Sequence, residues 1–379
     1  MNAIVNAKLI YQDEIVEDKI LLFDKAIVKI VDDINFDNIE VIDAKGNYVS
    51  PGFIDLHIHG SGGADVMDAT PEALKTISLV LLETGTTSFL ATTMTMSKAH
   101  IDNALQNIQL YSQDVTGAHI LGVHLEGPFI NVSKHGAQDK AYIQAPNRAL
   151  IEDYMNEVKM ITLAPEVEGA ESFIKYLSEE YPDVILSIGH SDADYEQSKE
   201  SFSWGVSHAT HLFNAMNPYH HREPGIVGAV FDSEVSCDII ADLVHTHASA
   251  LKLVHQVKKD KLILITDAMR AGCMKCGTYD LGGHKVTVEG SKASLEDGTL
   301  AGSVLKLNDA LKNMTTVTSM TLVEAVNAVT KIPAHKLELK KGELKVGYDA
   351  DIVIFDENFS IISTIVSGEV KYQRQGSKG

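Results

Sequence analysis

The chain has 379 residues, of which 45% are hydrophobic and 22% charged, so we expect a globular protein that buries a large core. Its formal net charge of −20 at pH 7 argues against binding to nucleic acid or to anionic membrane surfaces, because both attract basic proteins. An anionic small molecule is compatible with this charge, provided that local cationic groups bind it.

Three features of the sequence concern the cellular compartment. Residues 1–24 carry acidic residues among the apolar ones and lack the apolar segment of a signal peptide. No uninterrupted apolar run is long enough to cross a bilayer. Three cysteines are too few for a disulfide framework, which favours a reducing compartment. We therefore expect a cytoplasmic protein.

The two ends of the chain share one pattern. Residues 1–50 are predicted to form short strands, because apolar runs alternate there with Asp, Asn and Gly. The same pattern returns in residues 344–379. Neither end would bury enough apolar surface by itself. Both ends are therefore predicted to form one small β-sandwich domain.

Residues 51–343 alternate between strand-like and helix-like runs. After the first strand, Thr70 is the expected N-cap of a helix and Gly85 its stop. The strand-like runs are residues 53–60, 87–93, 118–127, 161–166, 184–190, 206–213, 235–242 and 261–268, and a last helix is expected near 303–316. About eight strands, most of them followed by a helix, are typical of a (β/α)₈ TIM-like barrel of the α/β class. A doubly wound sheet is the alternative, but no G-x-G-x-x-G follows the first strand.

Polar residues stand at the end of most of these strands. In the first run, "FIDLHIHG", His57 and His59 project to the same face of the strand, with Asp55 below them. The other ends carry His124 and Glu126, His190, His208 and His211, Asp242 and His245, and Asp267. The carboxyl ends of barrel strands meet around one axis, where the active sites of this fold lie.

This distribution predicts a metal site. Any one of these histidines is more simply explained as a hydrogen-bonded residue at a strand end. Four histidines and a carboxylate gathered around one axis instead form a site for a divalent transition metal. Asp267, on the last strand and apart from that set, is suited to carry protons for a metal-activated water.

Eight short segments occur in order along the chain: "FIDLHIHG", "GVHLEGPF", "GHSDA", "THLFNAM", "REPG", "ITDAM", "DGTLAGS" and "GYDADIVIFD". Together they resemble the amidohydrolase superfamily and, within it, the N-acetylglucosamine-6-phosphate deacetylases. The resemblance covers nearly the whole chain, and the second and fourth segments are specific to the deacetylases. It implies a metal-dependent barrel, a small β-domain built from both termini, and a homodimer.

The resemblance also implies the metal ligands. Glu126, His190 and His211 match the ligands common to the family. His57 and His59 match an additional pair that occurs only in members able to hold two metals. One or two divalent ions are therefore expected, zinc or iron, with cobalt or manganese as alternatives. Dihydroorotase-like relatives use a modified lysine on the fourth strand, and the absence of lysine from that strand here favours the deacetylases.

The same resemblance implies the catalytic and substrate-binding positions. Asp267 matches the catalytic acid and base. The positions that match contacts to the sugar phosphate are Ala137, Asn214, Ala215, Arg222, His245, Leu300, Ala301 and Gly302. One departure follows Asp242, where Leu243 stands at a position that is glycine in many relatives. His245 is retained and keeps its implied role, although the backbone path beside the substrate can differ.

The reaction that the resemblance implies is hydrolysis of the N-acetyl group of N-acetylglucosamine 6-phosphate to glucosamine 6-phosphate and acetate, in amino-sugar catabolism and cell-wall recycling. Asp267 would act first as general base and then as general acid. Arg222 is expected to reach the phosphate in the neighbouring subunit of a dimer. Two alternatives stay open: an amidohydrolase for another acylated sugar phosphate or a cyclic amide, and an inactive sugar-phosphate-binding protein.

Cys273 and Cys276 form a C-x-x-C pattern to which we assign no function. No fourth thiolate or nearby Cys/His pair completes a zinc site, and the pattern lies in a predicted loop after the last barrel strand.

Overall fold

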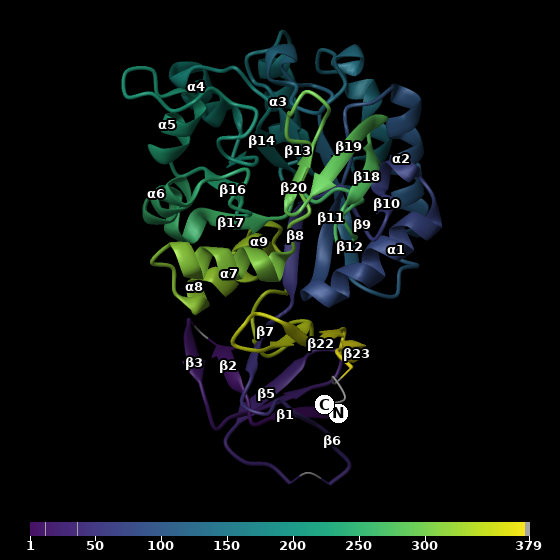
Figure 1. Cartoon of the computed structure of the whole chain (residues 1–379), viewed down its shortest axis with the longest axis vertical. Helices are drawn as coiled ribbons and strands as arrows, with labels where there is room; N and C mark the ends of the chain where they lie inside the picture. The colour runs from purple at the N-terminus through teal and green to yellow at the C-terminus, as the bar shows by residue number, and fades with distance from the viewer. Residues whose placement is uncertain (12, 36, 376–379) are drawn as a thin grey trace.

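Eight parallel strands form the centre of the molecule (Figure 1). The structure is a computed structural model that describes residues 1–11, 13–35 and 37–375. The strands follow the order β17-β16-β15-β14-β13-β12-β11-β8, and nearly all of their residues are buried, which explains their continuous apolar runs. They are β8 (Phe53–Ile58), β11 (Thr86–Thr92), β12 (His119–Glu126), β13 (Val158–Leu163), β14 (Ile185–Ile188), β15 (His208–Ala209), β16 (Ser236–Ile240) and β17 (Leu262–Ile265).

The first and last strands meet and close this sheet into a barrel. The backbone N–H of Asp267 donates to the carbonyl oxygen of His57 at 2.8 Å, and the backbone N–H of His59 donates to the carbonyl oxygen of Ala268 at 2.9 Å. Beside this seam, the Thr266 hydroxyl donates to the buried Asp55 carboxylate at 2.6 Å. The predicted (β/α)₈ barrel is confirmed, and its closure places Asp267 beside both histidines at the end of β8.

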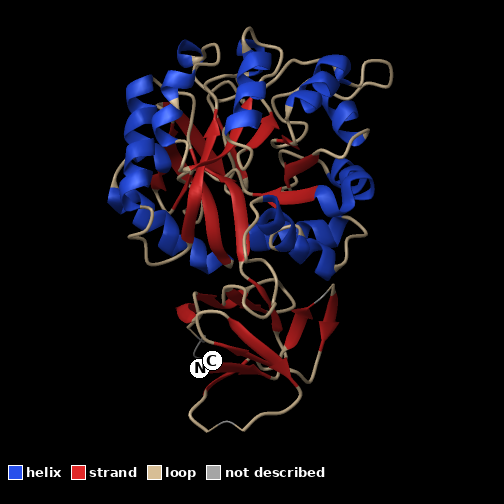
Figure 2. Ribbon diagram, turned by 180° about the vertical axis from the view of Figure 1, so that it is seen from behind, coloured by secondary structure: helices blue, strands red, loops and turns tan. Residues whose placement is uncertain are grey.

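Helices cover the outside of the barrel (Figure 2). They are α1 (Pro71–Leu81), α2 (Lys98–Tyr111), α3 (Ala170–Glu180), α4 (Tyr195–Trp204), α5 (Gly225–Phe231), α6 (Ala248–Lys258), α7 (Leu307–Val317), α8 (Leu322–Asn327) and α9 (Lys331–Lys336). The start of α1 follows the predicted signal, since the Thr70 hydroxyl accepts from the backbone N–H of Ala73. The α-helix ends at Leu81, before the predicted stop, and a 3-10 turn of Leu82–Thr84 continues it to Gly85, which takes a φ of 79°. None of the helices in the described part of the chain is long and apolar enough to span a membrane.

A second domain of two sheets lies at one end of the barrel and contains both chain termini (Figures 1 and 2). One sheet has the order β5-β4-β1-β6, and the other has the order β23-β22-β21-β7-β2-β3. The strands are β1 (Asn2–Val5), β2 (Lys8–Tyr11), β3 (Glu14–Val16), β4 (Ile20–Phe23), β5 (Ile27–Val31), β6 (Glu40–Asp43), β7 (Tyr48–Pro51), β21 (Ile352–Phe355), β22 (Ile361–Val366) and β23 (Glu369–Gln373). Because β7 pairs with β21, the two ends of the chain form one domain, as predicted. The division at residues 50 and 343 stays a prediction, and residues 376–379 of the predicted C-terminal part lie outside the described residues.

Gly52 joins the β-domain to the first barrel strand. Its backbone N–H donates to the carbonyl oxygen of Asp351 at 2.8 Å. A Cβ atom at this position would lie 2.1 Å from the Thr87 hydroxyl oxygen, a separation that no side chain tolerates. Glycine is therefore required where the chain enters the strand that carries His57 and His59.

Two small sheets lie among the loops at the carboxyl end of the barrel. One is a two-stranded ribbon of β9 (Gly60–Ser61) and β10 (Ala64–Asp65), and the other consists of β18 (Gly277–Leu281), β19 (His284–Glu289) and β20 (Lys292–Ser294). The three strands of the second sheet were not predicted from the sequence, where only residues 273–276 were assigned, to a loop. Two signals for it exist in the sequence: Gly282-Gly283 joins β18 and β19 as a tight turn, and Val286 and Val288 alternate with polar residues.

Candidate metal centre and substrate cavity

Three predicted ligands meet at the carboxyl end of the barrel. Glu126 ends β12, His190 follows β14, and His211 follows β15. The Oε1 atom of Glu126 lies 3.2 Å from Nε2 of His190 and 3.0 Å from Nε2 of His211, and these two nitrogens are 3.2 Å apart. All three side chains are buried, so one ion could contact them together.

A second group shares the same carboxylate. His57 and His59 project from the end of β8, and their Nε2 atoms lie 3.3 Å apart. Oε1 of Glu126 is 3.4 Å from Nε2 of His57, while Oε2 is 3.3 Å from Nε2 of His59. Glu126 therefore belongs to both groups, the predicted common set with His190 and His211 and a second set with the predicted additional pair, His57 and His59.

The donor atoms fit a divalent cation. The Nδ1 atoms of His190 and His59 face the carbonyl oxygens of Lys134 and Thr92 at 2.8 and 3.3 Å. Because a carbonyl oxygen can only accept, these rings carry their hydrogen on Nδ1 when neutral and present the lone pair of Nε2 to the centre. The Nε2 atoms of His57 and His211 lie 3.3 and 3.2 Å from these two lone pairs, so that on each side of Glu126 two imidazoles and a carboxylate oxygen are close enough to contact one cation.

The pKa values show how strongly the centre attracts positive charge. Burial lowers the pKa of His211, but its bond to Glu126 and the nearby carboxylates outweigh burial and raise the value to about 9. His59 is raised well above its ordinary pKa in the same way, by Asp267 and Glu126 against burial. Burial raises the pKa of Glu126, but the charge of His57 and the bonds to the histidines hold it well below its ordinary value. A bound metal replaces such protons as the positive charge.

Asp267, predicted to stand apart from the ligands, lies directly beside His57 and His59. Its Oδ1 atom is 3.4 Å from Nε2 of His57 and 3.3 Å from Nε2 of His59, the same separations that the oxygens of Glu126 show.

Three residues of the centre have a left-handed backbone conformation: Asp267 takes a φ of 49°, His190 one of 48° and His211 one of 33°. Such left-handed conformations strain residues other than glycine and are often found at functional sites.

His124 and His208 have the same strand-end pattern but do not join the ligand groups. His124 bonds to the carbonyl oxygen of Leu56 at 3.1 Å and to the Thr162 hydroxyl at 2.7 Å. His208 has one nitrogen 2.7 Å from a serine hydroxyl and the other 2.9 Å from Asp238. Burial also holds the pKa of both rings below the ordinary value. Both are hydrogen-bonded core residues.

A cavity of about 280 Å³ opens onto the ligand atoms. Of the predicted substrate-binding residues it is lined by Ala137, Asn214, Ala215, His245, Leu300 and Gly302. Ala301 is fully buried and packs with the apolar residues beneath the β18–β20 sheet. Arg222 is exposed, and it does not line the cavity of its own chain.

The departure after Asp242 has a visible consequence. Leu243 takes a φ of 63°, a conformation that favours glycine, and its side chain is exposed. His245 nevertheless keeps its place, because Asp242 accepts hydrogen bonds from its backbone N–H and from its Nδ1 atom, both at 2.7 Å. This pair fixes the ring of His245 and leaves Nε2 for the cavity.

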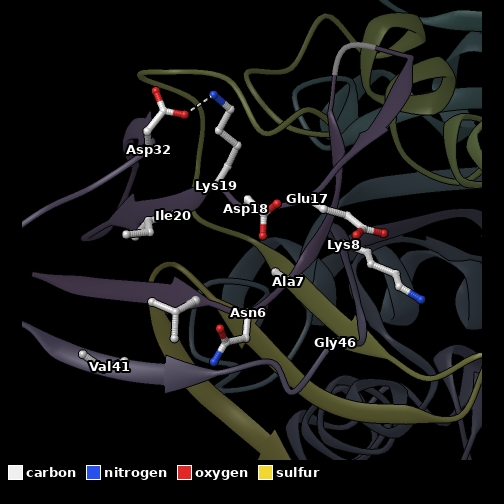
Figure 3. A pocket seen from close by; sticks show the side chains of 11 residues that line it. Asn6, Ala7, Lys8, Glu17, Asp18, Lys19, Ile20, Asp32, Val41 and Gly46 are labelled. Carbon is white, nitrogen blue, oxygen red and sulfur yellow. Dashed lines mark hydrogen bonds and ion pairs between the residues drawn. The ribbon is translucent and has the colours of Figure 1, made fainter.

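A larger cavity, of about 700 Å³, lies in the β-domain (Figure 3). It is lined by side chains of both charges, and Lys19 pairs there with Asp32. Among the described residues, the groups of side chains able to hold a metal lie in the barrel and not at this cavity. We therefore assign the functional site to the barrel.

Comparison with known proteins gives one consistent result. The model of the amidohydrolase family matches residues 48–371. N-acetylglucosamine-6-phosphate deacetylase from Lysinibacillus sphaericus is 42% identical over 358 residues, which cover 92% of each chain. The enzyme of that name from Bacillus subtilis is 42% identical over 334 residues, covering 85% of this chain and 84% of its own.

Solved structures agree with this result. The structure of N-acetylglucosamine-6-phosphate deacetylase from Pasteurella multocida has a TM-score of 0.94 and 31% identity, and the match covers 98% of this chain and 100% of that one. A variant of the Mycobacterium smegmatis enzyme, in complex with N-acetyl-D-glucosamine 6-phosphate, has a TM-score of 0.91 and 26% identity, with 98% and 99% covered.

Proposed function

The chain belongs to the amidohydrolase family and within it to the N-acetylglucosamine-6-phosphate deacetylases, and from this premise we propose that it hydrolyses N-acetylglucosamine 6-phosphate to glucosamine 6-phosphate and acetate. The observation that carries the proposal is the buried group of Glu126, His190 and His211 at a cavity that Asp267 also lines. The activity belongs to amino-sugar metabolism, and we extend it to cell-wall recycling.

Glu126, His190 and His211 would hold one ion, and His57 and His59 would hold a second together with Glu126. The bound metal supplies a Lewis acid that makes a water more acidic and polarises a carbonyl group. We propose zinc or iron, with cobalt or manganese as alternatives, because imidazole and carboxylate ligands accept all four.

The protein's own residues would handle protons and position the substrate. Asp267 accepts the proton of the attacking water and then delivers it to the amine nitrogen, which leaves poorly as an anion. Asp242 holds the ring of His245, whose Nε2 is left for the sugar phosphate. Asn214, Ala215, Leu300 and Gly302 line the same cavity and would contact the sugar, with Ala301 buried behind the last two.

The 6-phosphate should decide substrate choice. Acetate release from N-acetylglucosamine 6-phosphate and from N-acetylglucosamine should be compared at equal concentration and metal content. We expect a much higher kcat/KM for the phosphorylated sugar. Equal values would favour an amidohydrolase for a different acylated sugar or for a cyclic amide.

We propose that the protein is a cytoplasmic homodimer in which Arg222 reaches the phosphate of the neighbouring subunit. Arg222 is exposed, and its Nη1 atom lies 3.0 Å from Nε2 of His221. Within the described residues it has no ion pair, and in particular none with Glu223. Its planar guanidinium suits phosphate oxygens. The three cysteines are all free, in keeping with a reducing compartment.

Replacing Arg222 with alanine should lower kcat/KM on the order of 10²-fold, because a phosphate dianion enclosed in a cavity loses a charge-assisted partner. Subunit mixing tests whether the arginine acts across the dimer. In a heterodimer of an Arg222→Ala chain and an Asp267→Asn chain, an arginine acting across the interface leaves one site with both residues intact. Activity should then return. A verified heterodimer that stays inactive would contradict the cross-subunit role.

A further inference from the structure

Gln138 is a buried side chain that the proposed mechanism has not used. It lies in the loop between β12 and β13, is 5% exposed and lines the cavity. Its Nε2 atom donates to Oε2 of Glu126 at 2.7 Å, and its Oε1 atom accepts from the backbone N–H of Thr95 at 2.7 Å. A backbone N–H can only donate, so only one orientation of the amide satisfies both contacts.

The two oxygens of Glu126 have different neighbours, and Oε2 lies only on the His57–His59 side. Oε1 is within 3.4 Å of Nε2 of His190, His211 and His57, whereas Oε2 lies 3.3 Å from Nε2 of His59. The last torsion of a glutamate side chain has a broad distribution and no sharp preferred value. The hydrogen bond from Gln138 to Oε2 therefore fixes the turn of the carboxylate together with the contacts that His190 and His211 make to Oε1.

The anchor of Gln138 is itself held against the strand end that carries Glu126. Gly127, the residue after Glu126, has a φ of 72°, and a Cβ atom there would lie 2.1 Å from the Thr95 hydroxyl oxygen. The side chain of Thr95 thus packs directly against the backbone after Glu126. This contact restrains the distance between the Thr95 backbone N–H and Oε2 of Glu126, the two groups to which Gln138 bonds.

We propose that Gln138 is a positioning residue that turns Glu126 so that one carboxylate can serve both the His190–His211 side and the His57–His59 side. The inference rests on the metal centre of the proposed function, but its test needs no substrate. Loss of a hydrogen-bonding partner of a metal ligand commonly lowers metal affinity 10- to 100-fold. Because Gln138 bonds to Oε2, the ion held by His57 and His59 should be affected most.

The test is titration of the metal-free full chain with Co²⁺, followed by calorimetry and by the visible absorption of the bound ion. Gln138→Met, which keeps the length of the side chain but neither hydrogen bond, should weaken the looser Co²⁺ step at least tenfold and change its spectrum. The tighter step should change less than threefold. If the chain takes a single ion, the same tenfold loss is expected for that ion.

The matched control is Gln144→Met in the same loop, where the half-buried glutamine makes no side-chain hydrogen bond within the described residues. It should bind Co²⁺ as the unchanged chain does. Gln138→Asn, whose shorter amide cannot span both contacts, provides a second variant and should behave as Gln138→Met. Unchanged Co²⁺ affinity and spectrum in both Gln138 variants, or equal losses in the Gln144 control, would overturn the proposal. If the unchanged chain binds Co²⁺ and the Gln138 variants weaken that binding as expected, but the unchanged chain releases no acetate, the result would count against the proposed function alone.

Discussion

Asp267→Asn is expected to lower turnover of N-acetylglucosamine 6-phosphate on the order of 10²-fold or more, the usual effect of losing a general acid and base. Asparagine keeps the size and one oxygen of the side chain, but it cannot accept the proton of the attacking water. The ion of Glu126, His190 and His211 should be retained, because Asp267 contacts only the His57–His59 side. Steady-state kinetics beside metal analysis of the same sample measures both effects.

Turnover and metal content of the Asp267→Asn variant distinguish two ways in which this role could be wrong. Near-normal turnover with full metal content would show that Asp267 is not the proton carrier. Loss of all metal would show instead that Asp267 is an essential ligand, in which case its closeness to His57 and His59 matters more than its acidity.

His211→Ala is expected to remove the tighter ion and nearly all activity, and His190→Ala should do the same. Each change leaves Glu126 with one imidazole on that side, too few protein ligands to hold a transition metal tightly. The combined variant His57→Ala with His59→Ala should instead lose at most the second ion. Stoichiometric titration of each purified variant with Zn²⁺ provides the measurement.

This comparison tests how the ligands are divided. A combined His57 and His59 variant that loses all metal, while Glu126, His190 and His211 are intact, would contradict a separate, optional second site. His124→Asn is a suitable control, because His124 is buried beside the centre but has both ring nitrogens bonded to core groups.

The ligand cluster could be predicted from the sequence because two rules act together. Alternate residues of a strand share a face, and the carboxyl ends of barrel strands converge. These rules place His57, His59 and Glu126 at one centre, but they select His124 and His208 equally well. Only the hydrogen bonds inside the barrel, to a threonine and to Asp238, separate core histidines from ligands.

Contacts made by irregular loops could not be predicted from the sequence. The bond between Gln138 and Glu126 depends on the path of the loop after β12, which no local periodicity encodes. The distance between Asp267 and His59 depends on barrel closure, so the sequence indicates the strand that carries the acid but not that its carboxylate lies 3.3 Å from a ligand. The β18–β20 sheet was missed for a different reason, since Gly282-Gly283 and the alternation around Val286 were present but were not interpreted as a hairpin.

The most direct test is acetate release by the purified chain. The chain is first stripped of metal with a chelator, then supplied with one defined divalent ion and N-acetylglucosamine 6-phosphate, with Asp267→Asn treated identically. We predict equimolar acetate and glucosamine 6-phosphate, no release before metal is restored, and at least about 10²-fold slower release by the variant. A metal-loaded chain that releases no more acetate than the Asp267→Asn variant would contradict the assigned deacetylase activity.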